Sequence, residues 1–176
     1  AAHDHGTTLM SQVFGLVLGS RNKYDSNSAD ANPRLFACDR LFGDMTAIPV
    51  PDIDRTDHFL MIGANPLASG GSIMSLGDVR GRIHGIRQRG GTLVVVDPRR
   101  TETAKEASLH VPIRPGTDAA LVLGILNVLF AKGFIDEVEV GKIATGLGDL
   151  RAAVTPFPPQ RVAGVTGVSA ATITQL

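Results

Sequence analysis

The sequence predicts an α/β domain in which a mainly parallel sheet lies between two layers of helices. Two observations support this prediction. Short apolar runs alternate with helical stretches, and the runs are apolar at successive positions, as in strands that are covered on both faces. A helix that joins one such strand to the next forms the right-handed crossover typical of parallel sheets.

Two helices are expected before the first strand. Residues 7–18 carry apolar side chains on nearly every side, which predicts a buried helix that ends at Gly19. Pro33 favours the start of a second helix, since proline is well suited to the first helical turn, and Gly43 marks its end.

The strands of the sheet are predicted at residues 58–62, 92–96 and 109–113. An amphipathic helix that ends at Gly90 joins the first two strands, and its four arginines at 80, 82, 87 and 89 are expected to form a solvated face. After the third strand, residues 117–133 predict a helix that is apolar almost all round and therefore central. The remaining residues suggest short peripheral helices and turns.

Composition and charge exclude several classes of function. Lys and Arg number 17 and Asp and Glu number 17, so no net positive field attracts nucleic acid. No apolar run approaches the roughly 20 residues needed to cross a bilayer, so we expect a soluble segment without membrane insertion. The single cysteine, Cys38, excludes a multi-cysteine iron–sulfur cage within these residues. Without a targeting segment, a cytoplasmic location is the expectation.

The ends of the chain suggest that it was excised from a longer protein. The sequence begins without methionine. Ser169 predicts the N-cap of a helix that has barely begun where the sequence stops. We therefore expect an internal fragment.

Three polar clusters follow the three predicted strands: "GANPLASGGS", "DPRRTET" and "RPGTD". Ligands of open α/β sheets bind beyond the carboxyl ends of parallel strands, so these clusters should share one site. Glycines permit close backbone approach, and each helix N-terminus favours an anionic group by about 0.3 to 1 kcal/mol. The clusters predict a ligand that carries a pyrophosphate.

The first cluster departs from the common dinucleotide fingerprint. "GANPLASGG" does not fit G-x-G-x-x-G, and Pro66 removes a main-chain amide, which disfavours a nicotinamide domain. Asp118 at a helix start could accept two parallel hydrogen bonds from guanine, and Asp97 could accept from ribose hydroxyls. Both residues could instead be a turn former and a helix cap.

The segments "IGANPLASGGS", "VVVDPRRTETAKEASLHVPIRPGTDAALVLGILNVLFAKGFID" and "VAGVTGVSAATI" resemble the molybdopterin oxidoreductase family. These enzymes, such as formate dehydrogenases and nitrate reductases, carry bis-molybdopterin guanine dinucleotide with molybdenum or tungsten. The resemblance covers most of residues 57–176, and it rests on the order and spacing of the motifs.

The resemblance implies which residues bind the cofactor. In the family, the corresponding loops contact the pyrophosphate, ribose and guanine of one cofactor copy. Carried over to this chain, the contacts fall on Gly63, Asn65, Pro66, Ser69, Asp97, Pro98, Arg99, Gly116, Thr117 and Asp118.

The resemblance also implies a metal ligand in the first third of the chain. Family members carry a protein ligand to molybdenum about eleven residues after a glycine that corresponds to Gly19. Asp30 occupies that place, and "SADANP" is similar to the aspartate-ligand pattern of respiratory nitrate reductases. Asp30 could instead be a solvated loop residue. The absence of cysteine here departs from the formate dehydrogenase pattern.

We therefore expect residues 1–176 to form one Rossmann-like domain, with residues 1–56 as a lead-in and residues 57–176 as the dinucleotide-binding core. The resemblance implies that it belongs to a larger oxidoreductase, whose remaining domains are its partners and carry any iron–sulfur cluster. Alone it should be inactive. The alternatives are a free-standing nucleotide-dependent α/β enzyme and a non-catalytic interaction domain that retains the fold.

Overall fold

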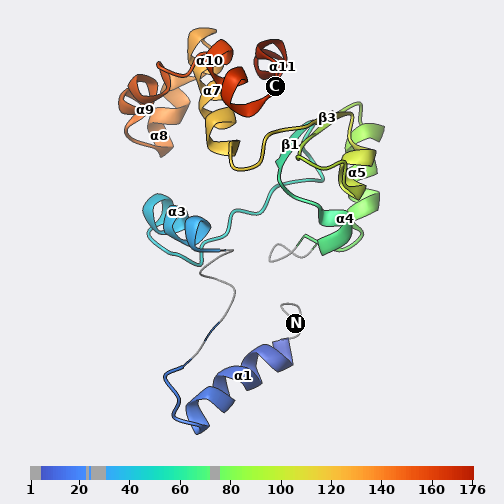
Figure 1. The fold of residues 1–176 in the computed structure, drawn as a ribbon, viewed down its shortest axis with the longest axis vertical. Coiled ribbons are helices and arrows are strands. Elements are labelled where there is room, and N and C mark those ends of the chain that lie inside the picture. Colours follow the sequence, from blue (N-terminus) through green and yellow to red (C-terminus); the bar gives the residue numbers. More distant parts are fainter. Residues whose placement is uncertain (1–4, 23, 25–30, 72–75) are drawn as a thin grey trace.

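The fold is built on a parallel sheet. A computed structural model describes residues 5–22, 24, 31–71 and 76–176. Its sheet has three strands in the order β1 (His58–Ile62), β2 (Thr92–Val96) and β3 (Leu109–Val111), all parallel (Figure 1). The predicted parallel arrangement is confirmed. The register pairs Ile62 with Val96 and Val96 with Val111, so the three carboxyl ends are level.

The third strand is shorter than predicted, because it ends at Val111 and not at residue 113. Pro112 follows directly and has no amide hydrogen to donate to a neighbouring strand. Ile113 nevertheless remains in the core, with 5% of its surface exposed. The apolar pattern thus identified the buried residues, while proline decided where pairing stops.

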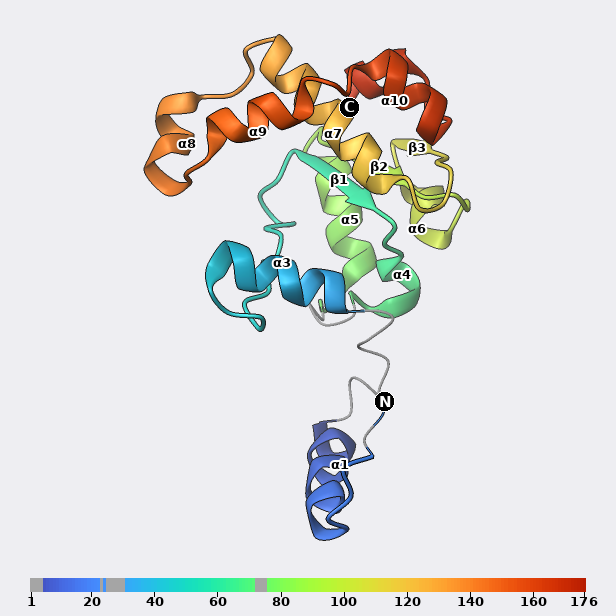
Figure 2. The ribbon, with the colours of Figure 1, turned by 60° about the vertical axis from the view of Figure 1, so that its left-hand side comes forward.

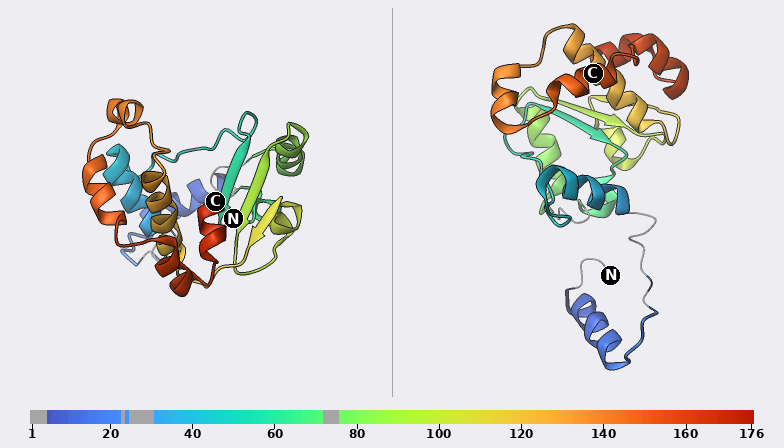
Figure 3. Two further views of the ribbon diagram at one scale, coloured as in Figure 1. Left: turned by 90° about the horizontal axis from the view of Figure 1, so that it is seen from above. Right: turned by 90° about the vertical axis from the view of Figure 1, so that its left-hand side faces the viewer.

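Helices cover both faces of the sheet. The described helices are α1 (His5–Val17), α3 (Asn32–Phe42), α4 (Pro66–Ser69), α5 (Val79–Gln88), α6 (Glu102–Glu106), α7 (Asp118–Ala131), α8 (Glu137–Ile143), α9 (Leu147–Val154), α10 (Pro159–Thr166) and α11 (Ala170–Gln175), of which α1 does not lie on the sheet. Seen from above, α5 and α6 lie on one side of the sheet, and the helices of the C-terminal part lie on the other (Figure 3). This is the expected three-layer α/β/α arrangement.

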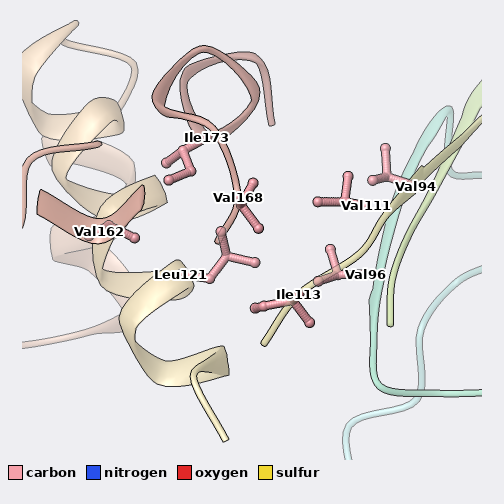
Figure 4. Packing of buried hydrophobic residues seen from close by; sticks show 8 residues of the cluster. All are labelled: Val94, Val96, Val111, Ile113, Leu121, Val162, Val168 and Ile173. Carbon is pink, nitrogen blue, oxygen red and sulfur yellow. The ribbon is translucent and has the colours of Figure 1, made fainter. Parts of the chain in front are cut away.

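The side chains of β2 supply both halves of the core. Val94 and Val96 join a cluster with residues of β3, α7, α10 and α11 (Figure 4). Leu93 and Val95 point to the opposite face and pack in a second cluster with residues of β1, α5 and α6. Successive strand residues face opposite sides, so an unbroken apolar run is what a doubly covered strand requires. Burying each such side chain contributes about 1.5 to 3 kcal/mol.

The arginines of α5 and its C-cap residue Arg89 do more than form a solvated face. Arg80 donates to the carboxylate of Glu106 in α6 at 2.7 Å. Arg89 donates to the main-chain oxygens of Ile53 and Thr56, both at 3.0 Å, in the segment that leads to β1. Exposed ion pairs contribute little stability, about 0 to 1 kcal/mol. These hydrogen bonds link α5 to α6 and to the segment that leads to β1.

The first helix forms as predicted, but its predicted burial is wrong. Leu9, Phe14 and Leu16 of α1 are 65%, 64% and 74% exposed. Figures 1 and 2 show α1 apart from the sheet and its covering helices. An apolar pattern specifies a local helix, whereas burial requires another element to pack on it. No helix among the described residues is both long and apolar enough to pass through a membrane.

Leu121 provides a test of the core cluster that α7 forms with Val94 and Val96 of the sheet. It is fully buried in α7, whereas the next residue, Val122, is 40% exposed. Leu121→Ala should lower the free energy of unfolding by about 2 to 5 kcal/mol, because it removes methyl groups and leaves a cavity. Val122→Ala should change it by roughly 0.5 kcal/mol. Urea unfolding followed by circular dichroism measures both. Equal effects would contradict the packing of α7 on the sheet.

Candidate functional site

The three polar loops begin side by side at the carboxyl edge of the sheet. Past the strand ends, the amide of Gly63 donates to the oxygen of Val96 at 2.8 Å, and the amide of Asp97 donates to the oxygen of Val111 at 3.1 Å. We call residues 63–69 loop 1, residues 97–101 loop 2 and residues 112–118 loop 3. Pairing thus brings together clusters that are far apart in the sequence.

Loop 1 turns sharply and leaves its backbone open. Gly63 has a φ of 64°, in the left-handed region that favours glycine. A Cβ atom added to Gly63 would meet no described atom within 4 Å. Pro66 is the first residue of α4, a position whose amide would have no partner within the helix, so the missing amide hydrogen of proline costs nothing there. Ser69 lies exposed at the last position of α4.

Asn65 of loop 1 bonds to α6. Its Oδ1 accepts hydrogen bonds from the hydroxyl of Thr103 at 2.7 Å and from the Thr103 amide at 3.2 Å. Its Nδ2 donates to Oε2 of Glu102 at 2.9 Å. From its sequence motif, Asn65 is expected to contact the cofactor. The structure shows that this side chain links loop 1 to the helix that follows loop 2.

The two carboxylates of α6 are stabilised in their charged form. The hydrogen bond from Asn65 lowers the pKa of Glu102, with help from the backbone and from nearby Lys105 and Arg99. The hydrogen bond from His84 lowers the pKa of Glu106 in the same way. A lowered pKa means that these bonds stabilise the fold above the usual glutamate pKa and are lost as the pH falls through the folded value. At neutral pH both ends of α6 are held.

Loop 2 is shaped by Asp97. This residue is buried, with 8% exposed, and its Oδ1 accepts a hydrogen bond from the amide of Arg99 at 2.8 Å. The bond closes a short turn of the kind that aspartate commonly forms. The ring Nε2 of His110 lies 2.9 Å from the main-chain oxygen of Asp97. Pro98 and Arg99 are exposed beside it.

Loop 3 leads directly into α7. Gly116 has a φ of 77°, and a Cβ atom there would meet no described atom within 4 Å. Thr117 holds the N-cap position, and its hydroxyl donates to the oxygen of Arg114 at 2.6 Å. Asp118 is the first residue of the helix and is exposed. The capping position therefore falls to Thr117, which leaves the carboxylate of Asp118 directed to the surface.

Arg114 anchors loop 3, a role that the sequence does not reveal. Its Nη1 donates to the main-chain oxygens of Val165 at 2.7 Å and Gly164 at 3.2 Å, in the last turn of α10. Its amide donates to the oxygen of Thr166 at 2.9 Å. A cation is favoured at a helix C-terminus because carbonyl groups there lack helical partners. The partners are main-chain atoms distant in sequence, so no motif reveals them.

The three loops at the carboxyl edge of the sheet fit an anionic ligand that also carries a polar ring. Two glycines leave room for close approach, and exposed Arg99 supplies positive charge. Asp97 and Asp118 offer carboxylate oxygens that can accept from hydroxyl and ring N–H groups. This set of groups matches the phosphates, sugar and base of a nucleotide. Asp30, the expected metal ligand, lies outside the described residues.

A cavity of about 480 Å³ lies beside loop 1. Its lining includes Gly63, Asn65 and Pro66, together with apolar side chains such as Phe59 and Met61. Among the described residues, its lining includes none from loop 2 or loop 3. A ligand that contacts all three loops would therefore lie along the carboxyl edge of the sheet and not inside this cavity.

Comparison with known proteins assigns the family. The model of the molybdopterin oxidoreductase family matches residues 3–173, so the chain belongs to this family. It is 36% identical over 114 residues to acetylene hydratase of Syntrophotalea acetylenica, which covers 65% of this chain and 15% of that protein. It is 31% identical over 160 residues to nitrate reductase of Synechocystis, which covers 90% of this chain and 22% of that protein.

Solved structures agree with this assignment. Acetylene hydratase from Pelobacter acetylenicus superimposes with a TM-score of 0.73 at 28% sequence identity, over 94% of this chain and 22% of that chain. Formate dehydrogenase H of Escherichia coli is 29% identical over 126 residues, which are 72% of this chain and 17% of that protein. The chain thus spans less than a quarter of the length of these relatives. The expected family is confirmed, and it implies a molybdopterin cofactor with molybdenum or tungsten.

Gly63 allows the geometry of loop 1 to be tested. Gly63→Ala should lower the free energy of unfolding by about 1 to 2 kcal/mol, because a side chain disfavours the left-handed backbone even where space is free. Gly77→Ala is a matched control, since Gly77 has no positive φ and equally open surroundings. It should be neutral or stabilise by roughly 0.4 to 1 kcal/mol. Urea unfolding measures both variants. An unchanged free energy of unfolding in Gly63→Ala would contradict the left-handed backbone at Gly63.

Proposed function

We propose that this chain holds the guanine dinucleotide arm of the molybdopterin cofactor within a larger molybdenum or tungsten oxidoreductase. The observation that supports this most is the level alignment of the three strand ends. It brings two open glycine turns and two carboxylates, Asp97 and Asp118, to one edge of the sheet. Ligands of parallel α/β sheets bind at this kind of edge.

Each loop has a distinct role in this proposal. The turn at Gly63 and the start of α4 receive the pyrophosphate, with the hydroxyl of Ser69 and the charge of Arg99 nearby. Asp97 uses Oδ1 to shape its turn, so Oδ2 accepts the ribose hydroxyls. Asp118 accepts the ring N–H and amino group of guanine, in two parallel hydrogen bonds.

The names of the relatives favour a role in holding the cofactor over a role in choosing the substrate. Proteins named acetylene hydratase, formate dehydrogenase and nitrate reductase all match this segment. Their reactions differ, so the shared part is best explained by the shared cofactor. The pterin and its metal supply the redox chemistry when bound, while this chain fixes their position. The formate and nitrate relatives support an oxidoreductase reaction for the whole protein in this proposal.

The remaining domains of the same enzyme are the proposed partners. The relatives are several times longer than this chain, so residues outside it complete the site. Only one cysteine, Cys38, is present, and it is buried in α3. An iron–sulfur cluster with several cysteine ligands therefore belongs to those other domains.

Recognition of guanine can be tested at Asp118 in the full-length enzyme. Asp118→Asn keeps the size of the side chain but places an amide NH₂ against a donor of guanine. The loss of a charged hydrogen bond should lower guanine dinucleotide retention by roughly tenfold. The melting temperature of the cofactor-free protein should barely change, because Thr117 occupies the N-cap. Nucleotide released per chain and thermal unfolding measure the two effects.

Asp149 offers a matched control for this substitution. It is also an exposed aspartate in the first turn of a helix, α9, away from the three loops. Asp149→Asn should leave guanine retention unchanged. Unchanged retention in Asp118→Asn, or an equal loss in both variants, would remove Asp118 from the guanine site. A full-length protein that binds another nucleotide or none would favour the two alternative functions.

The metal ligand is tested separately at Asp30. In the full-length enzyme, Asp30→Cys should add a sulfur neighbour to the metal, because a thiolate would replace the carboxylate oxygen. X-ray absorption spectroscopy at the metal edge measures this change. Asp25→Cys, in the same segment, should leave the metal neighbours unaltered. No new sulfur neighbour in Asp30→Cys would make Asp30 an ordinary loop residue.

A further inference from the structure

Thr103 is a fully buried polar residue at the centre of the site's framework, with 0% of its surface exposed. It lies in α6, just after loop 2, yet its hydroxyl serves loop 1. The hydroxyl donates to Oδ1 of Asn65 at 2.7 Å and accepts from the amide of Leu67 at 3.2 Å. One side chain therefore makes contact with the beginning of α4 at two points.

The amide oxygen of Asn65 is saturated by these contacts. An amide oxygen has two lone pairs, and here the hydroxyl and the amide of Thr103 each occupy one. One hydrogen of its Nδ2 is given to Glu102. The side chain is therefore directed to α6, with no acceptor capacity left for a ligand.

The helix that carries Thr103 is itself held firmly. The hydroxyl of Thr101 caps α6 by accepting from the amide of Ala104 at 3.1 Å. At the other end, Glu106 bonds to Arg80 and His84 of α5. Because α6 starts directly after loop 2, a bond from loop 1 to Thr103 fixes the two loops relative to each other. Hydrogen bonds in a buried environment of this kind are stronger than exposed ones.

We propose that Thr103 is a positioning residue, which sets loop 1 against loop 2 in the geometry that receives the cofactor. Asn65 then acts on cofactor binding through Thr103 and not by contact with the ligand. This inference rests on the proposed function for its effect on the cofactor. The link between the loops can be tested without cofactor.

The first test uses the cofactor-free full-length protein. Thr103→Val removes the hydroxyl and keeps the branched shape, so the amide of Leu67 loses its partner. Hydrogen exchange at Leu67 should become roughly tenfold faster. Thr103→Ser keeps the hydroxyl and should restore slow exchange. Unchanged exchange at Leu67 in Thr103→Val would overturn the proposed link.

Thr166 supplies a control for general destabilisation. It is also fully buried, and its hydroxyl donates to the oxygen of Val162 at 2.9 Å and accepts from the amide of Val168 at 3.1 Å. These partners belong to its own segment of the chain. Thr166→Val should leave exchange at Leu67 at the wild-type rate. Equally fast exchange in both valine variants would mean that Thr103 has only a general structural role.

The second test is a double-mutant cycle on the loaded full-length enzyme, read as guanine nucleotide retained per chain. Asn65→Ala and Thr103→Val should each lower retention by roughly tenfold, and the double variant should lose no more than either alone. Thr103→Ser should retain the nucleotide. Fully additive losses would show that Asn65 contacts the ligand itself and would overturn the proposal.

The two proposals fail in different ways. If Thr103→Val does not fold, Asn65→Ala takes its place in the retention measurement, because the side chain of Asn65 is partly exposed. Unchanged nucleotide retention in Asn65→Ala would reject the positioning role. Normal retention in Asp118→Asn, together with faster exchange at Leu67 in Thr103→Val, would reject the guanine site but keep the link between the loops.

Discussion

The parallel pairing of β1 and β3 with the central strand β2 is the constraint on which the rest of the structure depends. Because Ile62, Val96 and Val111 lie in register, three loops leave the sheet at one level. A shift of one residue would turn the apolar side chains of a strand to the opposite face. In β2 such a shift would exchange Leu93 and Val95 with Val94 and Val96, so the packing of both core clusters depends on this register, and the register in turn places the loops.

The helices have different tasks around this sheet. On one face α7, α10 and α11 close the core, and the C-terminus of α10 receives the side chain of Arg114, which anchors loop 3. On the other face α5 holds α6, and α6 holds loop 1 through Thr103. Loops 1 and 3 thus each have a helix behind them that fixes their position relative to the sheet.

The charged groups at the carboxyl edge of the sheet differ in their exposure and in their roles. Asp97 is almost buried and shapes its turn, while Arg99, two residues later, is exposed. Asp118 starts α7 but leaves the capping position to Thr117. Glu102 accepts a hydrogen bond from Asn65, which lowers the pKa of its carboxyl group. The chain is neutral overall, so any attraction for phosphate is local to this edge.

The sequence by itself determined the strands, the turns after them and the family, because apolar runs, glycines and prolines act on the backbone locally. The tertiary structure decided the partners of these residues. Asn65 meets Thr103 and Arg114 meets the end of α10 only after the chain has folded, since those partners lie 38 and about 50 residues away. The exposure of α1 was equally invisible, because a helical pattern does not reveal what packs against it. Local chemistry thus predicted the elements, and long-range packing assigned their contacts.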